Sequence, residues 1–210
     1  MSTFSENARQ RMSRLRPPAI GEALDPRRRR AERPRMQRGD EPHQLTPMDR
    51  LVEMDDYLLR QVVKTRKAPP AFLMRAMCRV LDPDIAILFI VMLVMAGGTF
   101  TKIGDRAGIA LIVASVVVGI VKYVVRRNRP DASLHDQPPP DRFSFPSGHT
   151  TAAFAVALSM FGVLPWLAPI AIGLAIVVAF ARMYLGVHYP LDVLAGAAVG
   201  MTVGSIVALF

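Results

Sequence analysis

Cysteine is nearly absent from this sequence, because Cys78 is the only one in 210 residues. A single cysteine excludes an intrachain disulfide and any metal site built from several cysteines. We expect it to be a core or interfacial thiol. No acidic cluster that could hold a magnesium ion stands out either, so neither a metal nor a cofactor is predicted. Residues 1–16 lack the apolar core of a cleavable secretory signal, and the N-terminus is expected to be retained.

Negative charge is also scarce, since 17 Asp and Glu stand against 26 Lys and Arg and leave a formal net charge of +9. Much of the excess lies in residues 1–45, which are rich in proline and contain four consecutive arginines at 27–30. Such a segment is typical of a disordered arm near anionic lipid headgroups, where each basic residue contributes about 1 kcal/mol. A nucleic-acid-binding arm is the alternative. No aromatic residues lie between the arginines, so no nucleic-acid partner is expected.

Residues 46–82 mix apolar and polar side chains. Threonine followed by proline at 46–47 marks a helix start, and apolar residues recur at helical spacing over 51–62. The proline pair at 69–70 is predicted to end this helix, and a second short helix is expected over 71–81. The first is amphipathic, and the second is too short and too charged to cross a bilayer of about 30 Å, so we expect both to lie along its surface.

Long apolar runs dominate the chain after residue 83, and they are typical of transmembrane helices. Five spans are expected, at 84–102, 107–125, 148–164, 166–184 and 191–210. The predicted fold class is therefore all-α, a polytopic membrane helix bundle. Its predicted parts are a disordered basic arm (1–45), amphipathic interfacial helices (46–82) and a membrane domain (83–210).

Three stretches rich in polar residues lie at the ends of the expected spans. In the first, KYVVRRNRPD, the cations Lys122, Arg126 and Arg129 are spaced at i, i+4 and i+7. A helix that continues to Pro130 would point all three in nearly one direction. Taken alone, they are better explained as cations that reach for headgroups at a helix end.

The second stretch, FPSGHT, places Ser147, Gly148 and His149 in the first turn of an expected span. Free backbone N–H groups and the helix dipole favour an anion there, and glycine permits its close approach. A simple cap and an interfacial histidine explain the same residues, so both interpretations stay open. His135, in the polar loop before this stretch, is interpreted as a loop residue and not as a catalyst.

The third stretch, ARMYLGVHYPLD, contains Arg182, His188 and Asp192. If a helix begins near residues 189–190, Asp192 lies within reach of a ring nitrogen of His188. A carboxylate there would fix the histidine tautomer and make the opposite nitrogen more basic. The alternative is a helix-start charge that the dipole stabilises.

All three stretches fall on the same side of the membrane when the expected spans are counted. Ionisable residues at membrane depth are costly and indicate function. Cations and backbone N–H groups can bind a phosphate dianion, one histidine can attack phosphorus, and a second can protonate the leaving oxygen. These residue types predict hydrolysis of a phosphate ester in which positive side chains replace a metal ion.

The spacing of these residues also resembles the three-part signature of the type 2 phosphatidic acid phosphatase superfamily. The matching parts are Lys122 with six residues before Arg129-Pro130, then Pro146-Ser147-Gly148-His149, then Arg182 with five residues before His188 and three before Asp192. This family contains lipid phosphate phosphatases, polyprenyl diphosphate phosphatases, soluble acid phosphatases and vanadium haloperoxidases. The resemblance implies that His188 is phosphorylated, Asp192 orients it, and His149 donates a proton. It also implies phosphate-binding roles for Lys122, Arg129, Ser147, Gly148 and Arg182, with Arg126 as an additional candidate.

Two departures from the family pattern stand out. Ala181 replaces the usual serine of the third motif, which removes one hydroxyl contact to phosphate. Membrane members usually have six spans, and here the first is replaced by residues 47–81. With five spans the arm and the site share one side, and only Lys102 and Arg106 lie on the other. The positive-inside rule then predicts a multi-pass protein of a bacterial inner membrane, with its site on the cytoplasmic face.

The expected substrate is a lipid whose phosphate lies at headgroup level and whose tail stays in the bilayer. Phosphatidic acid, phosphatidylglycerol phosphate and polyprenyl phosphates or diphosphates all meet this description. The alternatives are a catalytically inactive lipid-binding protein, against which the intact His149, His188 and Asp192 argue, and a vanadate-dependent haloperoxidase. A membrane-anchored nucleic-acid-binding protein would lose its role if residues 1–45 were deleted.

Overall fold

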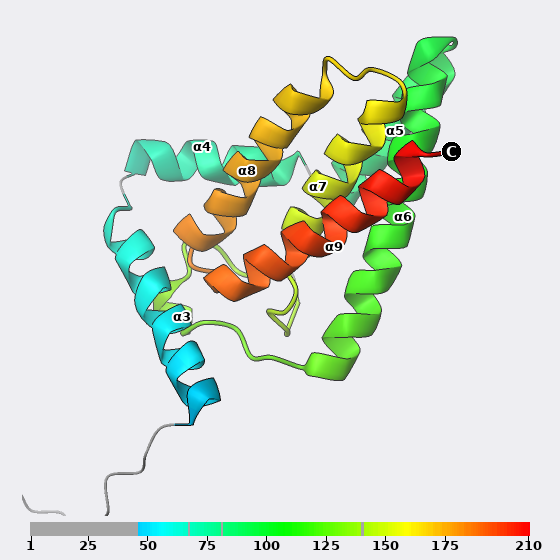
Figure 1. Cartoon of the computed structure of the whole chain (residues 1–210). Coiled ribbons are helices and arrows are strands. Elements are labelled where there is room, and N and C mark those ends of the chain that lie inside the picture. The colour runs from blue at the N-terminus through cyan, green and yellow to red at the C-terminus, as the bar shows by residue number, and fades with distance from the viewer. Residues whose placement is uncertain (1–45, 67, 81, 140) are drawn as a thin grey trace, which may run out of the picture. The chain divides into compact units, whose positions relative to one another are not determined.

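The computed structural model describes residues 46–66, 68–80, 82–139 and 141–210, which belong to one structural unit, Leu45–Phe210. Regular structure in these residues is helical, as predicted (Figure 1). The α-helices are α3 (Pro47–Lys64), α4 (Ala68–Arg79), α5 (Pro83–Ala96), α6 (Thr99–Val125), α7 (Gly148–Ser159), α8 (Ala168–Tyr184) and α9 (Pro190–Ala208), with short 3-10 turns η2 (Ala132–Leu134) and η3 (Met160–Gly162). The predicted arm, residues 1–45, lies outside the described residues.

The start of α3 follows its sequence signal. Thr46 and Asp49 form a reciprocal capping box, in which the Thr46 hydroxyl accepts a hydrogen bond from Asp49 N–H at 3.2 Å and the Asp49 carboxylate accepts one from Thr46 N–H at 2.9 Å. The end was predicted wrongly, because α3 stops at Lys64, before the proline pair. Residues 69–70 lie instead in the first turn of α4. Backbone N–H groups in a first turn have no acceptor within the helix, so proline, which lacks an N–H group, breaks no helical hydrogen bond there.

The first apolar hairpin also differs from the predicted spans 84–102 and 107–125. The chain turns at Gly97 and Gly98, whose φ angles of 82° and 60° are accessible to glycine at little cost. As a result α5 has 14 residues and α6 has 27. Residues 103–106, which the predicted spans left as a connection, lie in the first turns of α6.

The third expected span, 148–164, is shorter than predicted, because α7 ends at Ser159 and η3 follows. By length and composition α6 and α9 can cross a membrane, while Ile85–Ala96 and Ala168–Tyr184 are shorter apolar helices. Only 17% of the apolar stretch of α6 is buried against the protein, so most of its apolar surface faces outward. The count of five spans stays a prediction.

The core of the bundle is built around α7, which packs against α6, α8 and α9. Most of α7 is buried, and its many alanines let the neighbouring helices approach closely. The contact with α9 requires glycine: a Cβ atom would lie 2.7 Å from the Ser147 carbonyl oxygen at Gly196 and 2.5 Å from the Ala155 carbonyl oxygen at Gly204. This close packing fixes where the N-terminus of α7 lies.

The ends of four helices meet on one side of the bundle. In Figure 1 the C-terminal ends of α6 and α8 and the N-terminal ends of α7 and α9 are the lower ends of these helices. The helix α3 packs against α8 and α9, and α4 packs against α8. The three polar stretches singled out in the sequence are therefore gathered at this end.

Candidate active site

A cavity of about 590 Å³ lies between α5, α6 and α7 at this end of the bundle. Its polar end contains five predicted site residues, Lys122, Arg129, Gly148, His149 and His188, together with Asp82 and Asp141, which were not predicted. Most of the rest of its wall is apolar and includes Ile87 of α5 and Leu111, Ile112, Val116 and Val118 of α6. The cavity thus joins a charged end to an apolar groove.

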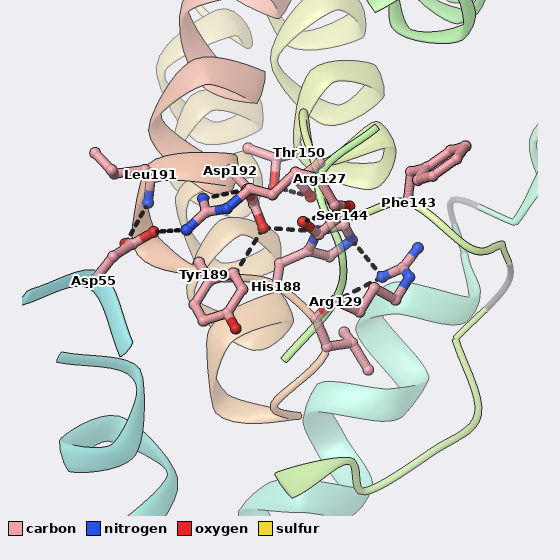
Figure 2. A network of polar contacts seen from close by, with 12 residues as sticks. Asp55, Arg127, Arg129, Phe143, Ser144, Thr150, His188, Tyr189, Leu191 and Asp192 are labelled. Atoms are coloured by element: carbon pink, nitrogen blue, oxygen red, sulfur yellow. Dashed lines mark hydrogen bonds and ion pairs between the residues drawn. The ribbon is translucent and has the colours of Figure 1, made fainter. Parts of the chain in front are cut away.

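His188 lies in the connection between α8 and α9 and is only 1% exposed. Its Nε2 atom accepts a hydrogen bond from Nη1 of Arg129 at 3.2 Å (Figure 2). Since a guanidinium only donates, Nε2 holds a lone pair and Nδ1 carries the hydrogen. Burial, then the positive charges of Arg182 and Arg129, lower the pKa of His188 well below its ordinary value of 6.5. His188 is therefore neutral at pH 7.

Asp192 lies beside His188 as predicted, but less closely than a hydrogen bond requires. The distance from Asp192 Oδ2 to His188 Nδ1 is 3.7 Å. The fully buried carboxylate instead accepts hydrogen bonds from Tyr189 N–H at 2.9 Å and from Nη1 of Arg127 at 2.7 Å (Figure 2). Asp192 caps the first turn of α9, and it also places a negative charge beside the buried histidine.

The prediction that Lys122, Arg126 and Arg129 share one helix face is wrong. The helix ends at Val125, because Arg126 adopts the left-handed conformation with φ 50° and its N–H group bonds to the Lys122 carbonyl oxygen. The Arg126 side chain is exposed, and its Nε donates to the Tyr123 carbonyl oxygen. Arg126 is therefore no part of the site.

Arg127, the next residue, turns inward and contacts Asp55, Asp192 and Tyr189. Its Nη2 lies 2.5 Å from Asp55 Oδ2, its Nη1 bonds to Asp192, and its guanidinium carbon lies 4.2 Å from the Tyr189 ring centroid. Burial lowers the pKa of Arg127, but the two carboxylates outweigh this and raise it. The sequence alone does not indicate which of the adjacent residues Arg126 and Arg127 points into the protein, because that depends on where the helix ends.

Asp55 was missed because it belongs to α3, far from the polar stretches in sequence. It is 1% exposed, and its Oδ1 accepts a hydrogen bond from Leu191 N–H at 2.9 Å (Figure 2). The sequence did contain a signal for Asp55, because it is a carboxylate on the otherwise apolar face of an amphipathic helix. Through Asp55 the α3 helix is tied to the first turn of α9 and to Arg127.

Lys122 and Arg129 share one carboxylate, Asp141, from the loop before α7. Asp141 Oδ2 lies 2.7 Å from Lys122 Nζ, and Oδ1 lies 2.8 Å from Arg129 Nη2. Burial raises the pKa of Asp141, but the hydrogen bonds from both cations outweigh this and hold the pKa below 3.8. Lys122 and Arg129, which were predicted to bind phosphate, are therefore paired in this structure with a carboxylate of the protein itself.

The first turn of α7 is formed as predicted. Ser147 is the fully buried N-cap residue, and its hydroxyl lies 2.9 Å from the Thr150 hydroxyl instead of capping the helix. Gly148 and His149 line the cavity. Nε2 of His149 lies 2.9 Å from Oδ1 of Asp82, the residue before α5. This second carboxylate–histidine pair was not predicted.

Arg182 lies in the last turn of α8 and is 1% exposed, and its charge acts directly on His188. Within the described part of the chain, its Nε and Nη2 atoms have no hydrogen-bond partner. Cys78 is buried beside it, as expected of a core thiol: burial raises the Cys78 pKa, and the Arg182 charge opposes this. Ala181 packs in the same apolar cluster as Cys78. His135 does not line the cavity, in agreement with its interpretation as a loop residue.

This arrangement defines a helical membrane protein with a cationic site that carries two histidines. Residues 106–210, half of the chain, match the PAP2 superfamily, and the protein belongs to this family. The resemblance found in the sequence motifs is thus confirmed.

Named relatives are phosphatases. A decaprenylphosphoryl-5-phosphoribose phosphatase of Mycobacterium tuberculosis is 44% identical over 103 residues, which cover 48% of this chain and 57% of the relative. An undecaprenyl-diphosphatase of Sulfolobus acidocaldarius is 35% identical over 100 residues, covering 45% and 48%. The chain therefore spans about half the length of these relatives.

Among solved structures, a transmembrane PAP2-type phosphatidylglycerolphosphate phosphatase from Bacillus subtilis superposes with a TM-score of 0.66. The superposition covers 76% of this chain and 85% of that one, at 24% sequence identity. This likeness confirms the predicted class of fold, an all-helical bundle of the PAP2 membrane-phosphatase type.

Proposed function

We propose that this protein is an integral membrane phosphatase that hydrolyses the phosphate monoester or diphosphate of a lipid through a phosphohistidine intermediate, without a metal ion. One observation carries the proposal. His188 is buried and neutral, and its Nε2 lone pair points to the guanidinium of Arg129 in a cavity that also contains Lys122 and His149. A neutral nucleophile among fixed cations is what attack on a phosphate dianion requires.

Two N–H donors of Arg182 without a hydrogen-bond partner among the described residues support a phosphate-binding position beside His188. Buried N–H groups are nearly always hydrogen-bonded in folded proteins, so Nε and Nη2 of Arg182 mark a position for an anionic oxygen. The N-terminus of α7, with Ser147 and Gly148, adds backbone N–H groups and the positive end of the helix dipole. These residues, with Lys122 and Arg129, would surround the phosphoryl group.

In the first step the lone pair of His188 Nε2 attacks phosphorus and forms a P–N bond. The P–O bond to the lipid breaks, its electron pair stays on the lipid oxygen, and His149 gives that oxygen a proton. Asp192 then faces a positively charged ring and stabilises it across the Nδ1 side. The lipid leaves as an alcohol or, from a diphosphate, as a monophosphate.

In the second step water attacks the phosphorus of the phosphohistidine and passes a proton to His149. The P–N bond breaks, and its electron pair returns to Nε2 of His188. Inorganic phosphate leaves. The two steps together consume one water molecule for each P–O bond that is broken. The cations that bind the phosphoryl oxygens supply the charge stabilisation that a metal ion gives other phosphatases.

The shape of the cavity supports a lipid as substrate. Its charged end lies at the helix ends, while its apolar wall runs along α5 and α6, so a headgroup phosphate and a tail can be held at once. The relatives named above act on polyprenyl-linked substrates, and the Bacillus subtilis enzyme acts on a glycerolipid phosphate. We propose this lipid-phosphate class for the present protein, without preference between the two.

We further propose a multi-pass protein of a bacterial inner membrane with the site on the cytoplasmic face. The outward apolar surface of α6 supports the membrane location. Exposed apolar side chains on α3, among them Leu51, Met54 and Leu58, support a position of this helix along the membrane surface. The basic arm would then lie among anionic headgroups.

The test is phosphate release by purified protein in detergent with EDTA present. The substrates are phosphatidic acid, phosphatidylglycerol phosphate, polyprenyl phosphates and polyprenyl diphosphates. His188→Ala should abolish release, whereas His135→Ala, which removes a histidine outside the cavity, should retain it. Enzyme quenched with SDS at alkaline pH should contain an acid-labile, base-stable phosphoryl group on His188.

Folded wild type that releases no phosphate from any of these lipids would refute the proposal and favour a lipid-binding role. Halide oxidation that depends on added vanadate would point to the haloperoxidase alternative. Activity that disappears with EDTA and returns with magnesium would refute the metal-free mechanism alone.

A further inference from the structure

Asp82 stands directly before Pro83, the first residue of α5, where an aspartate ordinarily caps the helix with its side chain. Its backbone has the extended conformation of an N-cap residue, yet its carboxylate makes no hydrogen bond to the N–H groups of α5. Oδ1 lies instead 2.9 Å from Nε2 of His149, and Oδ2 accepts a hydrogen bond from Arg79 Nη1 at 2.6 Å. Asp82 thus contacts the candidate site in place of its own helix.

The hydrogen in this pair belongs to the histidine. Burial raises the pKa of Asp82, but the hydrogen bonds from Arg79 and His149 outweigh this and hold the pKa below its ordinary value of 3.8. Asp82 is therefore a carboxylate at neutral pH, and a carboxylate only accepts. Nε2 of His149 consequently carries a hydrogen, and Nδ1 is the nitrogen left to exchange a proton with substrate.

Other charges around His149 oppose its protonated form. Arg182 of α8 and Lys122 of α6 act on it, His188 lies nearby, and its side chain is only 14% exposed. Burial and neighbouring cations both disfavour an imidazolium. A proton donor in this position needs a compensating negative charge, and Asp82 provides one at hydrogen-bond distance.

We propose that Asp82 is a positioning residue that fixes the orientation of His149 and stabilises its imidazolium, so that His149 can protonate the leaving group. This inference rests on the proposed function. In the step concerned, the P–O bond breaks, the lipid oxygen keeps the electron pair and takes the proton from Nδ1 of His149, and Nε2–H stays bonded to Asp82. Asp82 lies outside residues 106–210, the region that matches the superfamily. With Asp82 beside His149 and Asp192 beside His188, each of the two histidines has a neighbouring carboxylate.

The experiment compares Asp82→Asn, Asp82→Ala and Asp82→Glu with wild type on two substrates. A lipid monoester leaves as an alkoxide and needs a proton, whereas p-nitrophenyl phosphate leaves as a weakly basic phenolate and needs little help. Asp105→Asn, at the far end of α6, is the control for a lost carboxylate. Thermal unfolding in detergent shows whether each variant is folded.

Asp82→Asn should lower kcat on the lipid monoester by about 10- to 100-fold, as expected for a group that orients a catalytic residue. The loss on p-nitrophenyl phosphate should be much smaller, and the basic limb of the pH–rate profile should move to lower pH. Asp82→Glu should recover part of the activity. Equal losses on both substrates, or an unchanged kcat and pH profile in folded protein, would overturn the proposal.

The failure of this inference can be told from failure of the proposed function. Wild type and His188→Ala are measured in the same assay. If wild type releases phosphate and His188→Ala does not, the proposed function stands whatever Asp82→Asn does. A lower KM with unchanged kcat in Asp82→Asn would show that Asp82 merely competes with substrate for His149, and that outcome also overturns the positioning role.

Discussion

Asp141 makes the contacts that a substrate phosphate would make with Lys122 and Arg129, so its removal should tighten anion binding. Because Asp141 is 46% exposed, each of its two ion pairs is worth only about 0.5–1 kcal/mol after solvent screening. An anion must break both pairs, at a cost of about 1–2 kcal/mol, so Asp141→Asn should tighten phosphate binding by about 5- to 30-fold. The cations themselves are unchanged in this variant.

The assay for Asp141→Asn is competitive inhibition of lipid hydrolysis by inorganic phosphate and by orthovanadate at fixed ionic strength. Isothermal titration of phosphate into the detergent-solubilised protein gives the same affinity without relying on activity. Asp131→Asn removes an equal charge from an exposed position in the same loop and should change the affinity little. Unchanged or weaker phosphate binding by folded Asp141→Asn would refute the reasoning and show that Asp141 holds the two cations in their binding geometry.

Three further predictions follow from the buried network and from His188. Arg127→Met leaves the carboxylates of Asp55 and Asp192 unpaired and should lower kcat by about 10- to 100-fold, while the exposed Arg126→Met should behave as wild type in the same assay. Asp55→Asn should cost about 2 kcal/mol of stability, below the cost of breaking a fully buried pair because the amide keeps the Leu191 contact; unchanged thermal unfolding in detergent would contradict this. Since the pKa of His188 lies well below 6.5, the acid limb of the kcat/KM profile should lie below pH 6.5, and the stability that the neutral ring contributes should be lost over the same acidic range. A pH–rate profile with an acid limb at or above 6.5 would contradict the buried, neutral state.

The short-range features of the fold were readable from local residue patterns. Thr46 and Pro47 predicted the start of α3, because a helix cap is made by neighbouring residues alone. Gly148 and Pro190 likewise mark the first residues of α7 and α9. The helix ends were predicted less well: α6 begins at Thr99 because the chain turns at the preceding glycines, and an apolar run continues across that turn without a break.

The sequence by itself determined which cations and histidines to look for, because the spacing of Lys122, Arg129, His149, Arg182 and His188 is a property of the chain. Four of them line one cavity, and the charge of the fifth, Arg182, acts on His188. Helical packing makes this possible, since alternate helix ends must meet on the same side.

Only the tertiary structure decided which charges neutralise one another. Arg127 turns inward and Arg126 outward because one residue in the left-handed conformation redirects the chain after α6. Asp55 and Asp82 reach the site from segments more than 60 residues away along the chain. A buried carboxylate must find a partner in space, and no local pattern states which partner the packing of distant helices will bring within 3 Å.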